Sequence, residues 1–216
     1  MDTVLVLGQV LIVGASRGIG LGLVDVHLWE GWGVHATTRD GSSPRSNDLV
    51  AAHQLDVRND LQLDALVQEL ESPVDRIIHN AGINRAPRAE LMEINAEAPI
   101  RVVEALLDKG CLSPGGTVSI MTSQMGARKG RTRRLGDYGD SKAALNDEFR
   151  QRAPNWGEMG AIAVVIHPGW VKTDMGGQGA PITVTESAQG IISVIDGLTA
   201  DDHGKFLTWD GRIHPW

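Results

Sequence analysis

The stretch that decides the fold is Val10-Leu11-Ile12-Val13-Gly14-Ala15-Ser16-Arg17-Gly18-Ile19-Gly20. Residues 10–14 form a short apolar run, which is typical of a strand buried on both faces. Three glycines follow with the spacing Gly-x-x-x-Gly-x-Gly, and helical periodicity begins at about residue 18. Glycine permits a tight turn and lets backbone N–H groups approach a diphosphate at the start of a helix. The stretch therefore predicts a strand, a nucleotide-binding turn and a helix, although a turn that only packs strand against helix has the same pattern.

The same turn contains Gly-x-Ser-x-Gly through Ser16, the pattern of the nucleophile in one class of hydrolases. Those hydrolases place the nucleophile in the middle of the sheet, with an acid and a histidine later in the chain. Ser16 instead follows the first predicted strand, and no later histidine has a matching context. The sequence disfavours a hydrolase.

Beyond residue 20, apolar runs alternate with segments of helical periodicity. Repeated strand–helix–strand units favour right-handed crossovers and a parallel sheet. We expect a single Rossmann-type α/β domain over residues 1–216, with a doubly wound parallel sheet of about seven strands, helices on both faces, and a ligand at the carboxyl ends of the strands. Residues 1–9 are expected to be an extra strand or a flexible lead-in. The predicted strands are 10–14, 33–38, 52–56, 74–79, 116–122, 161–167 and 205–208, and the predicted helices are about 18–30, 60–71, 89–109, 138–153 and 184–198.

Composition and charge exclude several classes of function. The formal net charge is −7, and such a surface repels phosphate backbones, so no nucleic-acid partner is expected. The longest apolar stretch, residues 4–15, is too short to span a membrane. The single cysteine, Cys111, excludes an intrachain disulfide and fits a reducing cytoplasm. Scattered histidines predict no metal site.

The only tyrosine, Tyr138, stands four residues before Lys142. On a helix these positions share a face. A nearby ammonium favours the phenolate and lowers the tyrosine pKa from its ordinary value of about 10, which suits proton exchange near neutral pH. A tyrosine that merely packs on a lysine stem is the structural alternative.

Several motifs occur in one order along the chain: the glycine turn, Asn80-Ala81-Gly82, Asn95, Ser123, Tyr138-x-x-x-Lys142 and His167-Pro168-Gly169-Trp170-Val171-Lys172-Thr173-Asp174. In this combination the chain resembles the short-chain dehydrogenase/reductase family from residue 10 onward. Its segments 168–175 and 204–216 look most like the C-factor-like carbonyl-reductase branch. The resemblance implies an oxidoreductase that transfers hydride between a nicotinamide and a small-molecule carbonyl or alcohol substrate. It also implies a homodimer or homotetramer packed through the predicted helices 89–109 and 138–153.

The resemblance implies a catalytic set of Asn95, Ser123, Tyr138 and Lys142. Tyr138 would exchange the proton with the substrate oxygen, which Ser123 would polarise. Lys142 would bind the nicotinamide ribose and assist Tyr138, and Asn95 would hold a water in a relay to Lys142. The structural alternatives are a strand-end cap for Ser123, with Thr122 competing for its role, and a purely structural hydrogen bond for Asn95. The implied cofactor-binding residues are Gly14, Ser16, Arg17, Gly18, Ile19, Gly20, Arg39, Asp56, Val57, Asn80, Ala81, Gly82, Tyr138, Lys142, Pro168, Gly169, Val171 and Thr173. Of these, the resemblance implies that Asp56 and Val57 contact the adenine and that the segment from Pro168 to Thr173 binds the nicotinamide.

The choice of nicotinamide cofactor depends on the end of the second predicted strand, Thr37-Thr38-Arg39-Asp40. An acid at this place binds the ribose 2′-hydroxyl, whereas arginine accommodates a 2′-phosphate. Thr38 stands where NAD-preferring relatives have their acid, Arg39 follows it, and Arg17 adds a second cation. We therefore expect NADP(H) rather than NAD(H), with Asp40 as a group that could neutralise Arg39.

Two features leave alternatives open. The basic run 128–134 contains five cations and is either a solvated loop or an attractor of anionic substrates. Trp170, beside the implied nicotinamide segment, is the tryptophan that could touch substrate.

The rival to an enzyme is a non-catalytic NADP-binding regulator on the same fold. The complete Ser123, Tyr138 and Lys142 set favours the enzyme.

Overall fold

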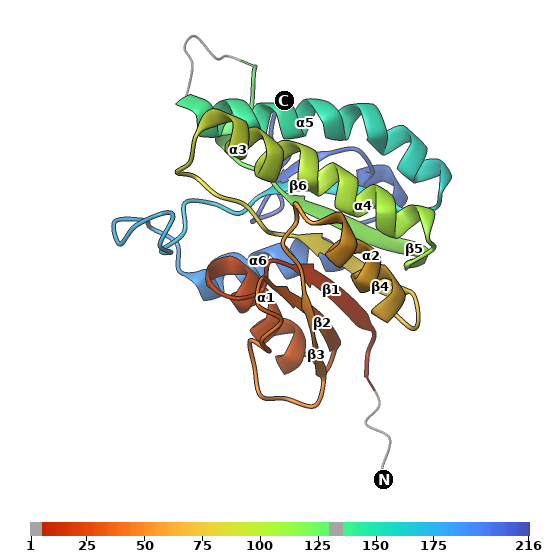
Figure 1. Cartoon of the computed structure of the whole chain (residues 1–216). Helices are drawn as coiled ribbons and strands as arrows, with labels where there is room; N and C mark the ends of the chain where they lie inside the picture. Colours follow the sequence, from red (N-terminus) through yellow and green to blue (C-terminus); the bar gives the residue numbers. More distant parts are fainter. Residues whose placement is uncertain (1–5, 130–135) are drawn as a thin grey trace.

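The computed structural model describes residues 6–129 and 136–216 (Figure 1). Its sheet has seven strands in the order β3-β2-β1-β4-β5-β6-β7, and each neighbouring pair is parallel. The predicted parallel sheet of about seven strands is confirmed. The strands are β1 (Gln9–Val13), β2 (Gly33–Thr38), β3 (Val50–Gln54), β4 (Val74–His79), β5 (Leu112–Met121), β6 (Ile162–His167) and β7 (Phe206–Thr208).

Helices cover both faces of the sheet (Figure 1). One face carries α2 (Asp60–Glu69), α4 (Ala98–Asp108) and α5 (Gly136–Glu158), and the other carries α1 (Gly18–Trp29) and α6 (Val184–Asp196). Alternate side chains of β1 supply the two cores, because successive residues of a strand point to opposite faces. Leu11 and Val13 join the first core, and Val10 and Ile12 join the second.

The strand order reverses between β1 and β4, which are neighbours at the centre of the sheet. A crevice forms outside the carboxyl ends of the strands at such a reversal, and ligands of doubly wound sheets bind there. The chain leaves β1 through the glycine turn and leaves β4 through Asn80-Ala81-Gly82. The topology thus brings these two motifs to one edge.

The helix predicted over 89–109 is in fact three segments: α3 (Arg88–Met92), a π-helical turn (Glu93–Glu97) and α4. In the π turn, the Ala98 N–H bonds the Glu93 carbonyl five residues back. Pro99 follows and has no N–H to donate, so the Asn95 carbonyl lacks the donor that a regular helix would supply. The sequence prediction missed this interruption, which lies at a candidate catalytic residue.

Other boundaries also differ from the predictions. The third strand is Val50–Gln54 rather than 52–56, because Asp56 already belongs to a turn in which its carbonyl accepts from the Asn59 N–H. Strand β5 begins at Leu112 rather than 116, with a register shift against β4. Of the predicted lead-in, residues 6–8 run beside residues 31–33 without forming a strand, and residues 1–5 lie outside the described ranges.

Candidate active site

The glycine turn is shaped by close backbone packing. Gly14 has φ +86, and a Cβ there would lie 2.8 Å from the backbone of Ala81. A Cβ on Gly20 would lie 2.0 Å from the Gly14 carbonyl oxygen. Gly18 differs, since it has φ +57 and its Cβ would meet only the Thr173 side chain, at 3.4 Å. Packing explains two of the glycines, whereas Gly18 leaves room for another molecule to approach the backbone.

The first turn of α1 fits an anion. Arg17 is the N-cap residue in extended conformation, and its side chain caps no backbone N–H of the helix. The first turn of α1 also contains no acidic side chain. Uncapped N–H groups and the helix dipole together favour a negatively charged group such as a diphosphate. Because α1 begins at the carboxyl edge of the sheet, its N-terminus faces the crevice.

The loop after β4 is joined to the glycine turn. The Asn80 side-chain amide donates to the Gly14 carbonyl at 2.8 Å, and the Asn80 and Ala81 N–H groups both donate to the Val13 carbonyl at 2.9 Å. At Gly82 a Cβ would lie 3.1 Å from Asn95 Oδ1 and 3.6 Å from Lys142 Nζ. The motif Asn80-Ala81-Gly82 thus lies between the predicted diphosphate site and the predicted catalytic residues Asn95 and Lys142.

The segment after β6 closes this edge from the other side. The Pro168 carbonyl accepts from the Ser187 hydroxyl of α6 at 2.7 Å, and Gly169 has φ +87. The Thr173 hydroxyl accepts from the Gly176 N–H at 3.0 Å, while its methyl group faces Gly18. Nearby, Arg17 forms an exposed ion pair with Asp174 of this segment, at 2.9 Å. The predicted diphosphate and nicotinamide segments therefore meet.

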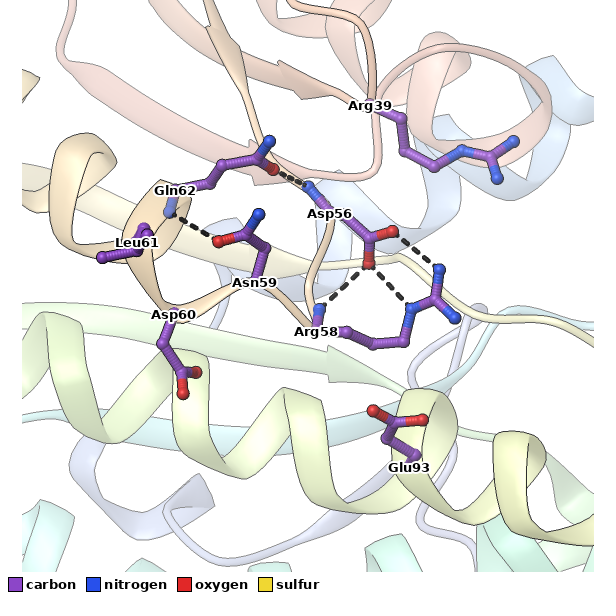
Figure 2. Close-up of a pocket in the computed structure, with 8 residues that line it drawn as sticks. All are labelled: Arg39, Asp56, Arg58, Asn59, Asp60, Leu61, Gln62 and Glu93. Carbon is purple, nitrogen blue, oxygen red and sulfur yellow. Dashed lines mark hydrogen bonds and ion pairs between the residues drawn. The ribbon is translucent and has the colours of Figure 1, made fainter.

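A cavity of about 660 Å³ opens beyond the end of β3 (Figure 2). It is lined by Arg39, Asp56, Arg58, Asn59, Asp60, Leu61, Gln62 and Glu93. The predicted adenine contact Asp56 lies in it, whereas Val57 is buried and its carbonyl accepts from Arg101 at 2.6 Å. Hydrogen bonds from Arg58 hold the pKa of the Asp56 carboxyl at about 2, so this acid is ionised at neutral pH.

The predicted phosphate ligand Arg39 borders the same cavity. Within the described ranges its guanidinium forms no ion pair. Asp40 is directed elsewhere, because its carboxylate accepts from the Ser42 N–H at 3.1 Å and from the Ser42 hydroxyl at 2.7 Å. The Thr38 hydroxyl donates to the Ser42 carbonyl at 2.9 Å and stabilises the same turn. Asp40 is therefore occupied by Ser42 rather than by Arg39.

Tyr138 lies in the first turn of α5, and the Ser123 side chain lies close enough to its phenol to act on the Tyr138 pKa. Ser123 follows β5, is only 7% exposed, and also accepts from the Met125 N–H at 3.1 Å. The competitor Thr122 donates instead to Asn146 Oδ1 at 2.6 Å. The structure thus brings Ser123, and not Thr122, to Tyr138.

Lys142 lies one turn beyond Tyr138 and is buried. Its Nζ donates to the Met121 carbonyl at 2.8 Å, and burial lowers its pKa to about 8. The pKa of Tyr138 is raised, because burial of the phenol outweighs the hydrogen bond from Ser123. The expectation that Lys142 brings the Tyr138 pKa below its ordinary value is wrong for this structure, because the desolvation of the phenol dominates. Tyr138 is therefore a protonated phenol at neutral pH, which suits a proton donor.

Asn95 is fully buried in the π turn. Its Oδ1 accepts from the Ile83 N–H at 2.9 Å, and its Nδ2 donates to the Ile83 carbonyl at 2.7 Å and to the Ser141 hydroxyl at 3.1 Å. The side chain thus makes the structural bonds that were the alternative to a relay role. Because Pro99 has no N–H, the Asn95 main-chain carbonyl has no donor four residues on, and it is the atom through which the predicted relay would run.

The family model for short chain dehydrogenases matches residues 8–181. The chain belongs to the short-chain dehydrogenase family. C-signal of Myxococcus xanthus is 37% identical over 158 residues, which are 67% of this chain and 93% of that protein. The NADPH-bound carbonyl reductase from chicken fatty liver has 30% identity and a TM-score of 0.85, with 98% of this chain and 100% of that chain covered. A Pseudomonas aeruginosa PAO1 carbonyl reductase in complex with NADP has 36% identity and a TM-score of 0.82, with 96% and 99% covered.

This short-chain dehydrogenase has two side chains at the site that sequence reasoning missed. Arg58 lies in the cavity against Asp56. His79 ends β4 and is buried, and among the described residues neither of its ring nitrogens has a partner. Burial and the nearby Lys142 charge lower the pKa of His79 to about 3. The i+2 spacing of Asp56 and Arg58 in a predicted loop was an available signal for Arg58; nothing in the sequence marked His79.

Two large apolar side chains are exposed on the segment after β6. Trp170 is 55% exposed and Met175 is 42% exposed, and the Trp170 indole N–H donates to the Gly176 carbonyl at 2.8 Å. Of the basic run, Arg128 is paired with Asp147, and residues 130–135 lie outside the described ranges. In those ranges, no helix is long and apolar enough to cross a membrane, and no His, Cys, Asp or Glu cluster is arranged to hold a metal ion.

Proposed function

We propose that the protein is an NADPH-dependent carbonyl reductase in which Ser123, Tyr138, Lys142 and Asn95 form the catalytic set. Family membership makes it an oxidoreductase. The observation that carries the residue assignment is the position of the protonated Tyr138 phenol near the buried Ser123 side chain, one helical turn before buried Lys142. Such a pair offers two hydrogen bonds to one carbonyl oxygen, as general acid–base chemistry at that atom requires.

Each of the four catalytic residues has its own role in the reduction. Bound NADPH supplies the hydride that reduces the substrate carbon. Ser123 polarises the substrate oxygen, and Tyr138 gives it a proton. Lys142 stands one turn away and stabilises negative charge on the Tyr138 oxygen when that proton leaves. The Asn95 carbonyl accepts a hydrogen bond in the path that returns a proton to the site.

The cofactor is NADP(H). Two similar reductases bind it in their solved structures, one of chicken and one of P. aeruginosa. In this chain the bare N-terminus of α1 fits the diphosphate, and Arg39 is available for the 2′-phosphate. Arg17 is a second candidate ligand, and it would have to leave Asp174 to reach the phosphate. Trp170 and Met175 are exposed on the segment after β6 and favour substrates with an apolar group.

Three further properties belong to this proposal: a cytoplasmic location, a single NADP-binding domain over residues 1–216, and a homodimer or homotetramer packed through α4 and α5. The lone Cys111 supports the location, and the resemblance to the family supports the assembly. Light scattering of the purified protein tests the assembly directly. A monomer at micromolar concentration would overturn it.

A second candidate is a non-catalytic NADP-binding regulator, and the observation that favours it is the 37% identity to a protein named C-signal. A regulator would bind NADPH without turning it over. The test is consumption of NADPH, and separately of NADH, against a panel of diketones, quinones, aldehydes and ketoacyl thioesters. Turnover with NADPH on at least one carbonyl supports the reductase. Tight NADPH binding with no turnover on any member supports the regulator.

A further inference from the structure

The cavity at the end of β3 contains an arginine whose function the catalytic set does not explain. The Arg58 guanidinium forms a bidentate ion pair with the Asp56 carboxylate: its Nε donates to Oδ1 at 3.0 Å and its Nη2 donates to Oδ2 at 2.8 Å (Figure 2). The Arg58 backbone N–H donates to the same Oδ1 at 3.0 Å. The other end of the Asp56 residue is also held, since its N–H donates to Gln62 Oε1 at 2.7 Å. The carboxylate therefore has one fixed orientation.

The hydrogen bonds leave one acceptor position of this carboxylate open. A carboxylate oxygen has two lone pairs. Oδ1 already accepts two N–H groups, whereas Oδ2 accepts one. Asp56 lines the cavity, and with the donors among the described residues its Oδ2 keeps one lone pair able to accept a donor such as an amino group. It repels an acceptor such as a ring carbonyl.

The charges around Arg58 argue against a phosphate at this place. The cavity lining contains the acids Asp56, Asp60 and Glu93 against the cations Arg39 and Arg58. Arg58 is neutralised by Asp56, and its Nη1 lies 3.7 Å from Glu90. Arg39 has no such partner in the described ranges. The 2′-phosphate thus belongs beside Arg39, and the neutral base belongs beside Asp56.

We propose that Arg58 is a positioning residue that makes the cavity selective for adenine, because it holds Asp56 as a fixed acceptor for the exocyclic amino group of the base. This inference rests on the proposed function, since it takes the cavity as the site of the adenosine half of NADP(H). Hypoxanthine presents a carbonyl where adenine presents its amino group. A fixed Asp56 rejects that carbonyl, whereas a released Asp56 turns toward the ring N–H of hypoxanthine.

The test compares NADPH with its deamino analogue, nicotinamide hypoxanthine dinucleotide phosphate, in equilibrium titrations followed by nicotinamide fluorescence. The wild-type protein should bind NADPH at least about tenfold more tightly than the analogue, because the fixed carboxylate loses its hydrogen bond and faces a carbonyl of like partial charge. Arg58→Gln should reduce that ratio to about threefold or less. Asp56→Asn should also reduce it, since an amide presents either a donor or an acceptor.

Two controls isolate the positioning role. Arg212→Gln removes an arginine with the same i+2 spacing from an aspartate, Asp210, outside this cavity, and should leave the ratio unchanged. Arg39→Ala should weaken both cofactors equally, because both carry the 2′-phosphate, and should also leave the ratio unchanged. Thermal melts establish that each variant folds, and Arg58→Lys serves as a second variant with an intermediate ratio expected.

An unchanged ratio in folded Arg58→Gln and Arg58→Lys overturns the inference. Equal affinity of the wild type for NADPH and the deamino analogue also overturns it, while leaving the proposed reductase intact if NADPH is turned over. Failure of the wild type to bind either cofactor overturns both the inference and the proposed function.

Discussion

The glycine turn and the catalytic cluster lie at the same edge of the sheet but are built in opposite ways. In the turn, the Ser16 and Arg17 side chains are exposed, and the backbone is packed closely at Gly14 and Gly20 but left open at Gly18. In the cluster, the buried side chains of Asn95 and Lys142 are fixed by bonds to backbone groups far away in sequence. Substitutions in the turn should therefore change binding, whereas those in the cluster should change chemistry or the stability of the fold.

The largest effect is expected at Tyr138. Tyr138→Phe removes the proton donor and keeps the ring, so kcat should fall by about 10²–10⁴-fold, the range of acid–base catalysis. The NADPH dissociation constant, from fluorescence titration, should change by less than about threefold. A variant that keeps more than about a tenth of the rate would show that Tyr138 is not the acid.

Burial of Lys142 should make stability depend on pH. Its pKa is about 8 in the folded protein against an ordinary value of 10.5. Between these values the unfolded chain binds the proton and the folded chain does not, so the free energy of unfolding contributed by Lys142 rises with pH. The shift corresponds to about 3 kcal/mol.

Urea unfolding of the wild type and of Lys142→Met measures this dependence, since the variant retains the other titrating groups. The difference in unfolding free energy, wild type minus variant, should increase by about 2–3 kcal/mol from pH 7 to about pH 10.5. A difference that stays flat, or falls, across this range would mean that Lys142 keeps its ordinary pKa.

The preference for NADPH over NADH tests the claim that substitutions at the cofactor site change binding. Arg39→Ala should weaken NADPH by roughly 10- to 150-fold, the cost of losing a charge-assisted hydrogen bond, and should leave NADH nearly unaffected. Titration of both cofactors with wild type and variant decides it. Equal losses for NADPH and NADH would exclude Arg39 as the ligand of the 2′-phosphate.

The smallest effect is expected at Gly18. Gly18→Ala and Gly31→Ala both place a side chain at positive φ, +57 and +85, and each should cost about 1 kcal/mol of stability. Only Gly18→Ala should weaken NADPH binding, by about tenfold, because its methyl group occupies the approach to the turn backbone. If both variants bind NADPH like the wild type, the diphosphate does not contact this turn.

The fold was largely predictable because its signals are local. Buried parallel strands appear as short apolar runs, and the glycine spacing marks the first crossover directly. The exceptions also have local causes that periodicity does not register. The π turn before Pro99 keeps the helical pattern of apolar residues, so a search for periodicity treats residues 89–109 as one helix.

The sequence predicted which residues form the candidate site, but not their protonation or the partners that their side chains contact. The sequence identifies Tyr138 and Lys142 by spacing, yet the raised pKa of Tyr138 depends on burial by the whole fold. Asn95 is identifiable as a polar residue in an apolar segment, but its partner Ile83 belongs to another loop. Arg58 lies between Asp56, two residues before it in sequence, and Glu90 of α3, which only the folded chain brings within 3.7 Å of its guanidinium.

The most direct test of the central claim is a single turnover with NADPH that carries deuterium in the transferred position of the nicotinamide, using a carbonyl found active in the panel. The account predicts one deuterium on the carbinol carbon of the product for each NADPH oxidised, with the wild-type protein, and almost none with Tyr138→Phe over the same time. Product alcohol without deuterium, or equal transfer by both proteins, would contradict it.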